Sequence, residues 1–125
     1  ENPLDRVQPV VTKDELLELV RETRNVEAND RIFDYVTTLA EATRTHPMVE
    51  LGVSPRGALA LCRMAKAHAF LAGRNYAVPE DVAAIFPDVC AHRLMLNSKA
   101  RMMEEKAENI LAEILKSVDM PVLKA

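Results

Sequence analysis

Three consecutive residues, Ser54, Pro55 and Arg56, have the types and order that can bind an anion. A serine can accept hydrogen bonds from the free N–H groups of a helix start, and proline suits the first helical position. Arg56 then places a permanent positive charge in the first turn, where the helix dipole is already positive. At an exposed site this mismatch costs about 0.3–1 kcal/mol. A phosphate would offset the cost, because the helix start offers it N–H groups, dipole and charge together.

Two further cations, Arg63 and Lys66, continue this charge along the same predicted helix. At about 100° per residue, Arg56 and Arg63 share a face, and Lys66 lies one turn beyond Arg63. We call these three residues the basic stripe. It is interpreted either as a solvated face on an otherwise apolar helix or as a binding surface. A DNA recognition helix is disfavoured, because the helix is too apolar for a groove and contains neither Asn nor Gln.

The rest of the sequence offers little catalytic or metal-binding chemistry. The three glycines, at positions 52, 57 and 73, cannot form the phosphate loop G-x-x-x-x-G-K-S/T. No paired carboxylates lie in an apolar setting, and no Ser–His–Asp order suggests a nucleophile. The histidines, His46, His68 and His92, are expected to be structural. Taken alone, the chain is predicted to be neither an enzyme nor a metal-binding protein.

The composition is that of a soluble globular domain. The 125 residues are 49% apolar and 28% charged, with a net charge of −3, which suits a single core and disfavours nucleic acid or anionic membrane as partners. No apolar run approaches the roughly 18 residues that span a bilayer, and no secretory signal opens the chain. Cys62 and Cys90 lack metal-ligand spacing. They are expected to be buried thiols in a reducing compartment, which predicts a cytoplasmic protein.

Helical periodicity predicts an all-α bundle of about five helices, with only the opening segment and the run RLML expected to be extended. The start signals are the Thr12–Glu15 capping box, Asn29, Ser54 and Pro79, and the stop signals are His46-Pro47 and Gly73. The predicted helices cover residues 13–24, 30–45, 55–72, 79–86 and much of 98–118. The third is apolar almost all round and is expected in the middle of the bundle.

A resemblance to the C-terminal lid domain of MoxR-family AAA+ ATPases runs through residues 51–96, LGVSPRGALALCRMAKAHAFLAGRNYAVPEDVAAIFPDVCAHRLML. In that family a Ser-Pro-Arg helix start precedes an Ala/Leu-rich helix, a Gly-Arg-Asp/Asn-Tyr segment, a Pro-Glu-Asp-Val helix start and a later His-Arg-Leu. The opening ENPLDRVQPVV resembles the exit from the ATPase core, and ILAEILKSVDMPV resembles the final helix. The resemblance therefore implies a linker from a missing AAA+ core over residues 1–11 and a helical lid domain over residues 12–125.

The same resemblance implies a nucleotide site that this chain completes. Arg56 corresponds to the sensor-2 arginine, which reaches the phosphates of ATP bound in the neighbouring core domain. Ser54 and Pro55 would hold the helix start that aims it. Arg56 is thus the candidate catalytic residue, and Ser54, Pro55 and Arg56 are the candidate ATP-binding residues, with Mg²⁺ bound by the core. The parent protein would be an ATP hydrolase, a ring homo-oligomer such as a hexamer, and a chaperone-like assembly factor acting with von Willebrand factor A domain proteins.

Two positions and one alternative function stay open. Val78 replaces the family's usual Thr, so the helix that begins at Pro79 loses a side-chain cap, at a cost on the order of 1 kcal/mol. Arg93 matches the family's His-Arg-Leu but has no assigned physical role. The alternative is a free-standing helical interaction module whose basic stripe docks an acidic partner. The two functions differ in what Arg56 is for.

Overall fold

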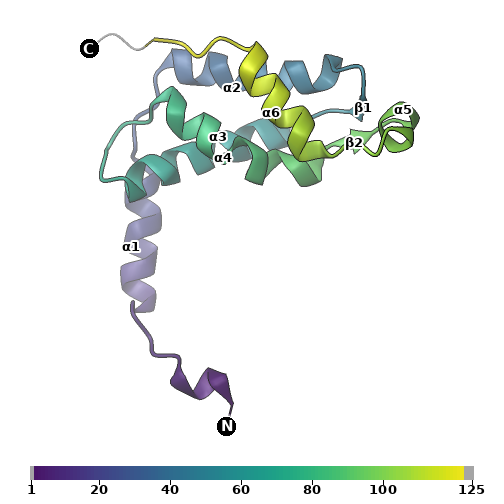
Figure 1. Cartoon of the computed structure of the whole chain (residues 1–125). Coiled ribbons are helices and arrows are strands. Elements are labelled where there is room, and N and C mark those ends of the chain that lie inside the picture. The colour runs from purple at the N-terminus through teal and green to yellow at the C-terminus, as the bar shows by residue number, and fades with distance from the viewer. Residues whose placement is uncertain (1, 123–125) are drawn as a thin grey trace.

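The structure, a computed structural model, describes residues 2–122 and confirms the all-α fold (Figure 1). The helices are α1 (Lys13–Arg24), α2 (Asp30–Thr45), α3 (Pro55–Leu71), α4 (Pro79–Cys90), α5 (Ser98–Met102) and α6 (Ala107–Ser117). A two-stranded antiparallel sheet, β1 (Val49–Leu51) with β2 (Met95–Leu96), and two 3₁₀ turns, Pro3–Arg6 and Ala91–Arg93, complete the described part. None of the helices among residues 2–122 is long and apolar enough to cross a membrane.

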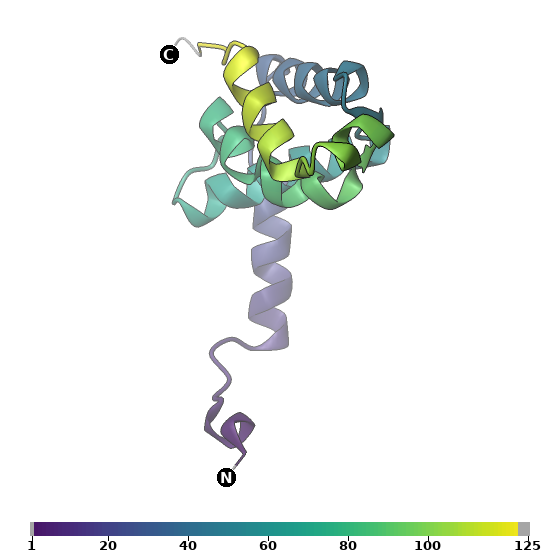
Figure 2. The same ribbon diagram turned by 45° about the vertical axis from the view of Figure 1, so that its right-hand side comes forward.

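The core lies between α2, α3, α4 and α6. Helix α6 packs against both α2 and α4, and α3 packs against α2 and α4, so the four helices enclose one apolar cluster (Figure 2). Its largest fully buried apolar side chains are Phe86, Ile32, Leu39, Leu61, Ile110 and Leu111. Burying a side chain of this size is worth about 1.5–3 kcal/mol, so this cluster stabilises the helices that position the candidate site.

The helix boundaries that had explicit chemical signals are confirmed. Thr12 and Glu15 form the reciprocal capping box of α1, at 3.1 and 2.9 Å. Helix α3 ends at Leu71. Two residues later Gly73 adopts the left-handed conformation, with φ of 85°. There the N–H of Gly73 donates to Phe70 O and the N–H of Arg74 donates to Ala69 O, which satisfies two carbonyls that the helix leaves free.

Two predicted boundaries near the C-terminus are wrong. Helix α4 does not stop at Phe86 but continues through Pro87 to Cys90, because burial of Val89 and Cys90 outweighs the hydrogen bond that the proline removes. The helix predicted over much of 98–118 is two helices. Glu104, with φ of 54°, ends α5 in the left-handed conformation, and α6 begins three residues later. This break gives six α-helices among the described residues rather than about five.

The short sheet was only half predicted. The extended run RLML contains β2, but its partner β1 was not expected. The two strands pair Val49 with Leu96 and Leu51 with Met95, which brings the segment before α3 beside the segment after α4. A pairing across more than forty residues leaves no local sequence signal.

Helix α1 stands away from the bundle (Figures 1 and 2). It has no buried residue and touches the rest of the fold mainly through α3. Its end is held by the segment that follows: the N–H of Glu27 donates to Asn75 O, and the N–H of Ala77 donates to Glu27 O. The opening segment before it was predicted to be extended, but Pro3–Arg6 forms a 3₁₀ turn.

Helix α3 is less enclosed than its composition predicted. One face, with Leu61, Ala65 and Ala69, is buried against the bundle. Leu59 and Leu71 on the other sides remain 57% and 85% exposed. The helix is therefore the inner wall of the bundle on one face and an apolar outer surface on another.

Candidate functional site

The predicted helix start at residues 54–56 forms as expected. Ser54 has extended backbone angles and its Oγ accepts a hydrogen bond from the N–H of Gly57, at 3.1 Å. Pro55 occupies the first position of α3. Pro55 has no N–H, the N–H of Gly57 binds Ser54 Oγ and the N–H of Ala58 donates to Ser54 O, so only the N–H of Arg56 has no partner within the first turn and points out of its positive end. The start of α3 thus offers an anion one free backbone N–H and the positive end of the helix dipole.

Residues of α2 hold this helix start in place. The buried Thr43 accepts a hydrogen bond from the N–H of Val53 at 2.9 Å, and Arg44 Nε donates to Val53 O at 2.8 Å. Gly52 lies so close to α2 that a Cβ atom there would be 2.7 Å from the Arg44 N and from Thr43 Oγ1. The loop before Ser54 is therefore held against α2, and this contact fixes the direction in which α3 begins.

Arg56 is exposed, and its guanidinium forms no hydrogen bond or ion pair with any of residues 2–122. A charge in the first turn that opposes the dipole thus has no partner in the described part of the chain. Arg93 lies near the same turn: its Cδ would be 3.2 Å from a Cβ at Gly57, and its Nε donates to Val89 O. Arg93, to which the sequence assigned no role, therefore packs beside the helix start.

The structure divides the basic stripe. Arg63 and Lys66 lie two and three turns along α3 from Arg56, and they line a groove between α1 and α3 together with Arg24. Arg24 comes from a different helix, so its place beside Arg63 and Lys66 depends on how α1 packs and was not predicted. Arg56 is not among the residues that line this groove.

The strongest buried electrostatic network was missed by the reasoning from the sequence. The fully buried carboxylate of Asp81 accepts two hydrogen bonds from Arg74, one from the N–H of Val78 and one from His68 Nδ1, each at 2.7 Å. Burial raises the pKa of Asp81, but the hydrogen bonds from Arg74, Val78 and His68 outweigh it and lower the pKa to about 2. A sequence signal existed: the acidic residue two positions after Pro79 is where a capping carboxylate is expected.

The network also compensates for the side-chain cap that Val78 does not provide. Val78 has no side-chain acceptor, as predicted, but Asp81 reaches back to bind its N–H. Half of a capping box therefore remains. Because the same carboxylate binds Arg74, the start of α4 is tied to the loop that leaves α3.

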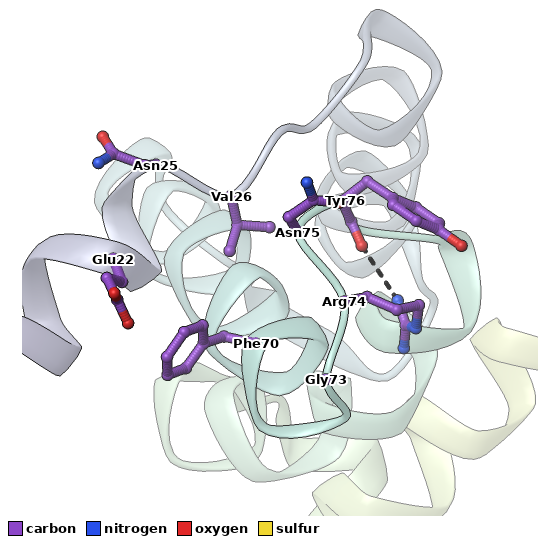
Figure 3. A pocket seen from close by; sticks show the side chains of 8 residues that line it. All are labelled: Glu22, Asn25, Val26, Phe70, Gly73, Arg74, Asn75 and Tyr76. Carbon is purple, nitrogen blue, oxygen red and sulfur yellow. Dashed lines mark hydrogen bonds between the residues drawn. The ribbon is translucent and has the colours of Figure 1, made fainter.

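A pocket of about 850 Å³ lies beside this loop (Figure 3). Val26 and Phe70 line one side of it, and Arg74 and Tyr76 line another; Arg74 also donates to Tyr76 O at 3.1 Å. The guanidinium of Arg74 is already paired with Asp81, so its charge is neutralised within the fold. None of the predicted site residues lines this pocket.

His46, His68 and the two cysteines have structural surroundings, whereas His92 is exposed and forms no hydrogen bond with any of residues 2–122. His46 accepts from the N–H of Met48, and His68 binds Asp81. Cys62 is half-buried and Cys90 is buried; burial raises the pKa of both thiols, that of Cys90 to about 11. Among residues 2–122, no group of three or more His, Cys, Asp or Glu side chains could hold a metal ion.

Comparison with known proteins identifies the class of domain that this fold and helix start define. The model of the AAA lid domain family matches residues 41–114, more than half of the chain. The chain therefore belongs to the AAA lid domain family, and within it to the lids of MoxR-type AAA+ ATPases, as its relatives show.

Three of these relatives cover nearly all of the chain. It is 40% identical over 124 residues to "Uncharacterized protein YeaC" of Bacillus subtilis and 30% identical over 129 residues to "Chaperone MoxR1" of Mycobacterium tuberculosis. A crystal structure of a "putative ATPase" from Cytophaga hutchinsonii matches 94% of the chain at 31% identity, with a TM-score of 0.86. The chain spans 39%, 34% and 38% of these three proteins, so it corresponds to a part of each.

Proposed function

We propose that this chain is the nucleotide-sensing lid of an AAA+ ATPase and that Arg56 is its sensor-2 arginine. The observation that carries the proposal is an exposed arginine, without a partner among residues 2–122, in the first turn of a capped helix. Such a helix start can bind phosphate through the free backbone N–H of Arg56, the helix dipole and the guanidinium. The membership in the AAA lid family supports a nucleotide as the source of that phosphate.

We further propose that an AAA+ core domain of the same polypeptide binds most of the nucleotide and Mg²⁺. Arg56 then reaches the phosphates from the lid side, while Ser54 and Pro55 keep α3 directed at them. ATP bound between core and lid supplies the negative charge that Arg56 neutralises. Because the loop before α3 is fixed on α2, a movement of Arg56 toward the phosphates moves the whole bundle. This is how nucleotide state would be coupled to lid position.

The whole protein's role is proposed from its relatives. A relative bearing the name "Chaperone MoxR1" supports chaperone-like remodelling or assembly as the work that ATP hydrolysis drives. A ring homo-oligomer such as a hexamer, a cytoplasmic location and a partner with a von Willebrand factor A domain belong to the same proposal. Reading the coding sequence before Glu1 tests its premise: a phosphate loop followed by an acidic strand end is expected there.

Replacing Arg56 with alanine in the intact protein tests the sensor assignment. We expect ATP turnover to fall more than tenfold, because a charge that stabilises the phosphates in the transition state is removed. Arg101→Ala is the control: Arg101 is an exposed arginine on α5 whose guanidinium donates to Leu96 O at 3.0 Å and approaches Glu50 at 4.0 Å, away from the start of α3. Circular dichroism should show both variants folded. Unchanged turnover in Arg56→Ala would exclude the assignment.

The isolated chain should bind ATP only weakly. One guanidinium and a helix start make few contacts, whereas a complete nucleotide site surrounds its ligand. Isothermal titration calorimetry of the 125-residue chain with ATP is the measurement. A micromolar Kd would show that the chain holds a more complete site than residues 54–56 provide.

A further inference from the structure

A groove of about 730 Å³ separates α1 from the second half of α3. Its lining residues are Leu16, Leu19, Val20, Thr23, Arg24, Arg63, Lys66, Ala67, Phe70 and Leu71. We call it the α1–α3 groove. On each helix the lining spans eight residue steps, about 12 Å, which is the length of roughly two helical turns.

The floor of the α1–α3 groove is apolar. Leu16, Leu19 and Val20 come from α1 and Phe70 comes from α3, while Leu71, 85% exposed, lies at its open edge. Leu19 and Val20 remain 39% and 41% exposed although they face another helix, so the contact between α1 and α3 leaves their side chains partly uncovered. Contiguous exposed apolar surface with a polar rim is typical of a site that binds another protein segment.

The rim of the groove is positively charged. Arg24, Arg63 and Lys66 line it, and none of them forms a salt bridge with any of residues 2–122. No carboxylate of the described residues lines the groove. This local excess of three cations contrasts with a chain whose net charge is −3. An occupant that carries carboxylates beside its apolar side chains would neutralise the rim and cover the floor.

We propose that the α1–α3 groove binds an acidic amphipathic helix of a partner protein. Two turns of such a helix would place apolar side chains at i, i+3 or i+4, and i+7 on the floor, with Glu or Asp residues toward Arg24, Arg63 and Lys66. A membrane surface is disfavoured, because a flat bilayer does not reach the floor of a groove between two helices. The groove is separate from the helix start at Arg56, so this interaction does not depend on the nucleotide proposal.

Two synthetic 14-residue helical peptides test the proposal. Both carry the same leucines at i, i+3, i+7 and i+10, with either Glu or Lys at the flanking positions. Fluorescence anisotropy with the full-length protein should show binding of the Glu peptide, weakened at least tenfold between 50 and 500 mM salt, and no binding of the Lys peptide. The double variant Arg63→Glu/Lys66→Glu should weaken binding of the Glu peptide at least tenfold.

Two further variants test the contributions of the charged rim and the apolar floor separately. Lys99→Glu/Arg101→Glu makes the same charge change on α5, outside the groove, and should leave the affinity for the Glu peptide within about twofold. Leu19→Ser should weaken binding of the Glu peptide at 500 mM salt as well as at 50 mM salt, because it removes part of the apolar floor. Circular dichroism checks that each variant is folded.

Five outcomes would overturn the proposal. Equal binding of both peptides, or binding of neither, would exclude an acidic helix. Sedimentation with phosphatidylserine vesicles that Arg63→Glu/Lys66→Glu abolishes would indicate a membrane surface. A dimer in analytical ultracentrifugation that the same variant dissociates would indicate a second copy of the chain. Protection of Leu19→Cys from thiol labelling in a Cys62→Ala background of the full-length protein would show that the protein's own chain covers the groove. These assays need no nucleotide, so they leave the Arg56 proposal untouched.

Discussion

The carboxylate of Asp81 shows how one residue can connect three parts of the fold. It binds the loop after α3 through Arg74, the side of α3 through His68 and the start of α4 through Val78. A fully buried charge is costly unless hydrogen bonds and an opposite charge surround it, and here all of them are present. We therefore expect the charge of Asp81 to hold α3, the loop after it and the start of α4 in their relative positions.

Replacing Asp81 with asparagine tests this role. At pH 7 the variant should lose about 3 kcal/mol of unfolding free energy, because Arg74 and His68 lose their charged acceptor. The pKa of Asp81 is about 2 in the folded chain, against an ordinary value of 3.8 for an aspartate in water. Its contribution is therefore complete above pH 4 and is lost as the pH falls toward 2, by about 2 kcal/mol in all.

Urea unfolding of both proteins from pH 7 to pH 2 measures the effect. The difference in unfolding free energy between wild type and Asp81→Asn should narrow between pH 4 and pH 2. Because both proteins share every other carboxylate, their common titrations cancel in the difference. A difference that stays constant with pH would contradict the assigned role of the Asp81 charge.

Three glycine-to-alanine changes distinguish close approach from backbone strain. At Gly52 a Cβ would be 2.7 Å from the Arg44 N, an atom of the α2 backbone, so Gly52→Ala should cost about 1–3 kcal/mol. At Gly57 it would meet the tip of Val53, and the gain in helix propensity of about 1 kcal/mol offsets part of the clash. Gly73 has open space but φ of 85°, so Gly73→Ala should cost about 1 kcal/mol. Thermal unfolding should rank Gly52→Ala as the most damaging.

At the scale of elements, the helix boundaries that local chemistry marks were predictable. Ser54-Pro55, Asn29 and Gly73 act on N–H and C=O groups within a few residues, so their effect can be read from the sequence. The continuation of α4 through Pro87 could not be read in this way. It depends on the burial of Val89 and Cys90 against other helices, which is a property of the tertiary fold.

Restoring the family's usual residue before α4 should stabilise that helix. Val78→Thr keeps the shape of the side chain and adds an oxygen that can accept from a first-turn N–H. We expect the unfolding free energy to rise by about 0.5–1 kcal/mol, measured by urea unfolding. Val78→Ala is the control, because it removes the branched side chain without adding an acceptor. Equal effects of Thr and Ala would show that Asp81 alone provides the cap.

Glu104 has a backbone conformation that suits glycine better than glutamate. Its φ of 54° places it in the left-handed region, where an L-residue other than glycine is strained by about 1–2 kcal/mol. Glu104→Gly should therefore raise the melting temperature, with a net gain of about 0.5–1 kcal/mol after the entropy that glycine loses on folding. Glu105→Gly, at the next position, has no such strain to relieve and should lower the melting temperature.

At the scale of the whole molecule, the sequence predicted the all-α fold and the capped start of α3, but not which surfaces stay open. The exposure of Leu59 and Leu71 on α3 depends on how α2 and α1 pack beside them, and no periodicity within α3 shows it. The candidate site was predicted where its residues are adjacent, at 54–56. The Asp81 network and the α1–α3 groove each join residues from separate elements, so only the fold brings them together.

Helix α1 should be much less protected than α2 and α4 when the chain is studied alone. It has no buried residue, whereas α2 buries six and α4 buries seven. Local opening of α1 therefore breaks few apolar contacts. Hydrogen exchange followed by mass spectrometry should show α1 amides exchanging at least tenfold faster than those of α2 and α4. Equal protection would mean that α1 belongs to the cooperative bundle.

The division into a linker over 1–11 and a lid over 12–125 stays a prediction.

The length of α3 has a mechanical consequence. Its 17 residues form one helix with Arg56 in the first turn and Leu71 in the last, about 22 Å apart. Proline occurs in it only at the first position, so the helix has no built-in hinge and acts as a lever arm. A tilt of about 10° about its first turn would carry Leu71 through about 4 Å, close to the rise of three helical residues. A small displacement at the phosphate end would thus be magnified at the far end, where α1 rests against the same helix.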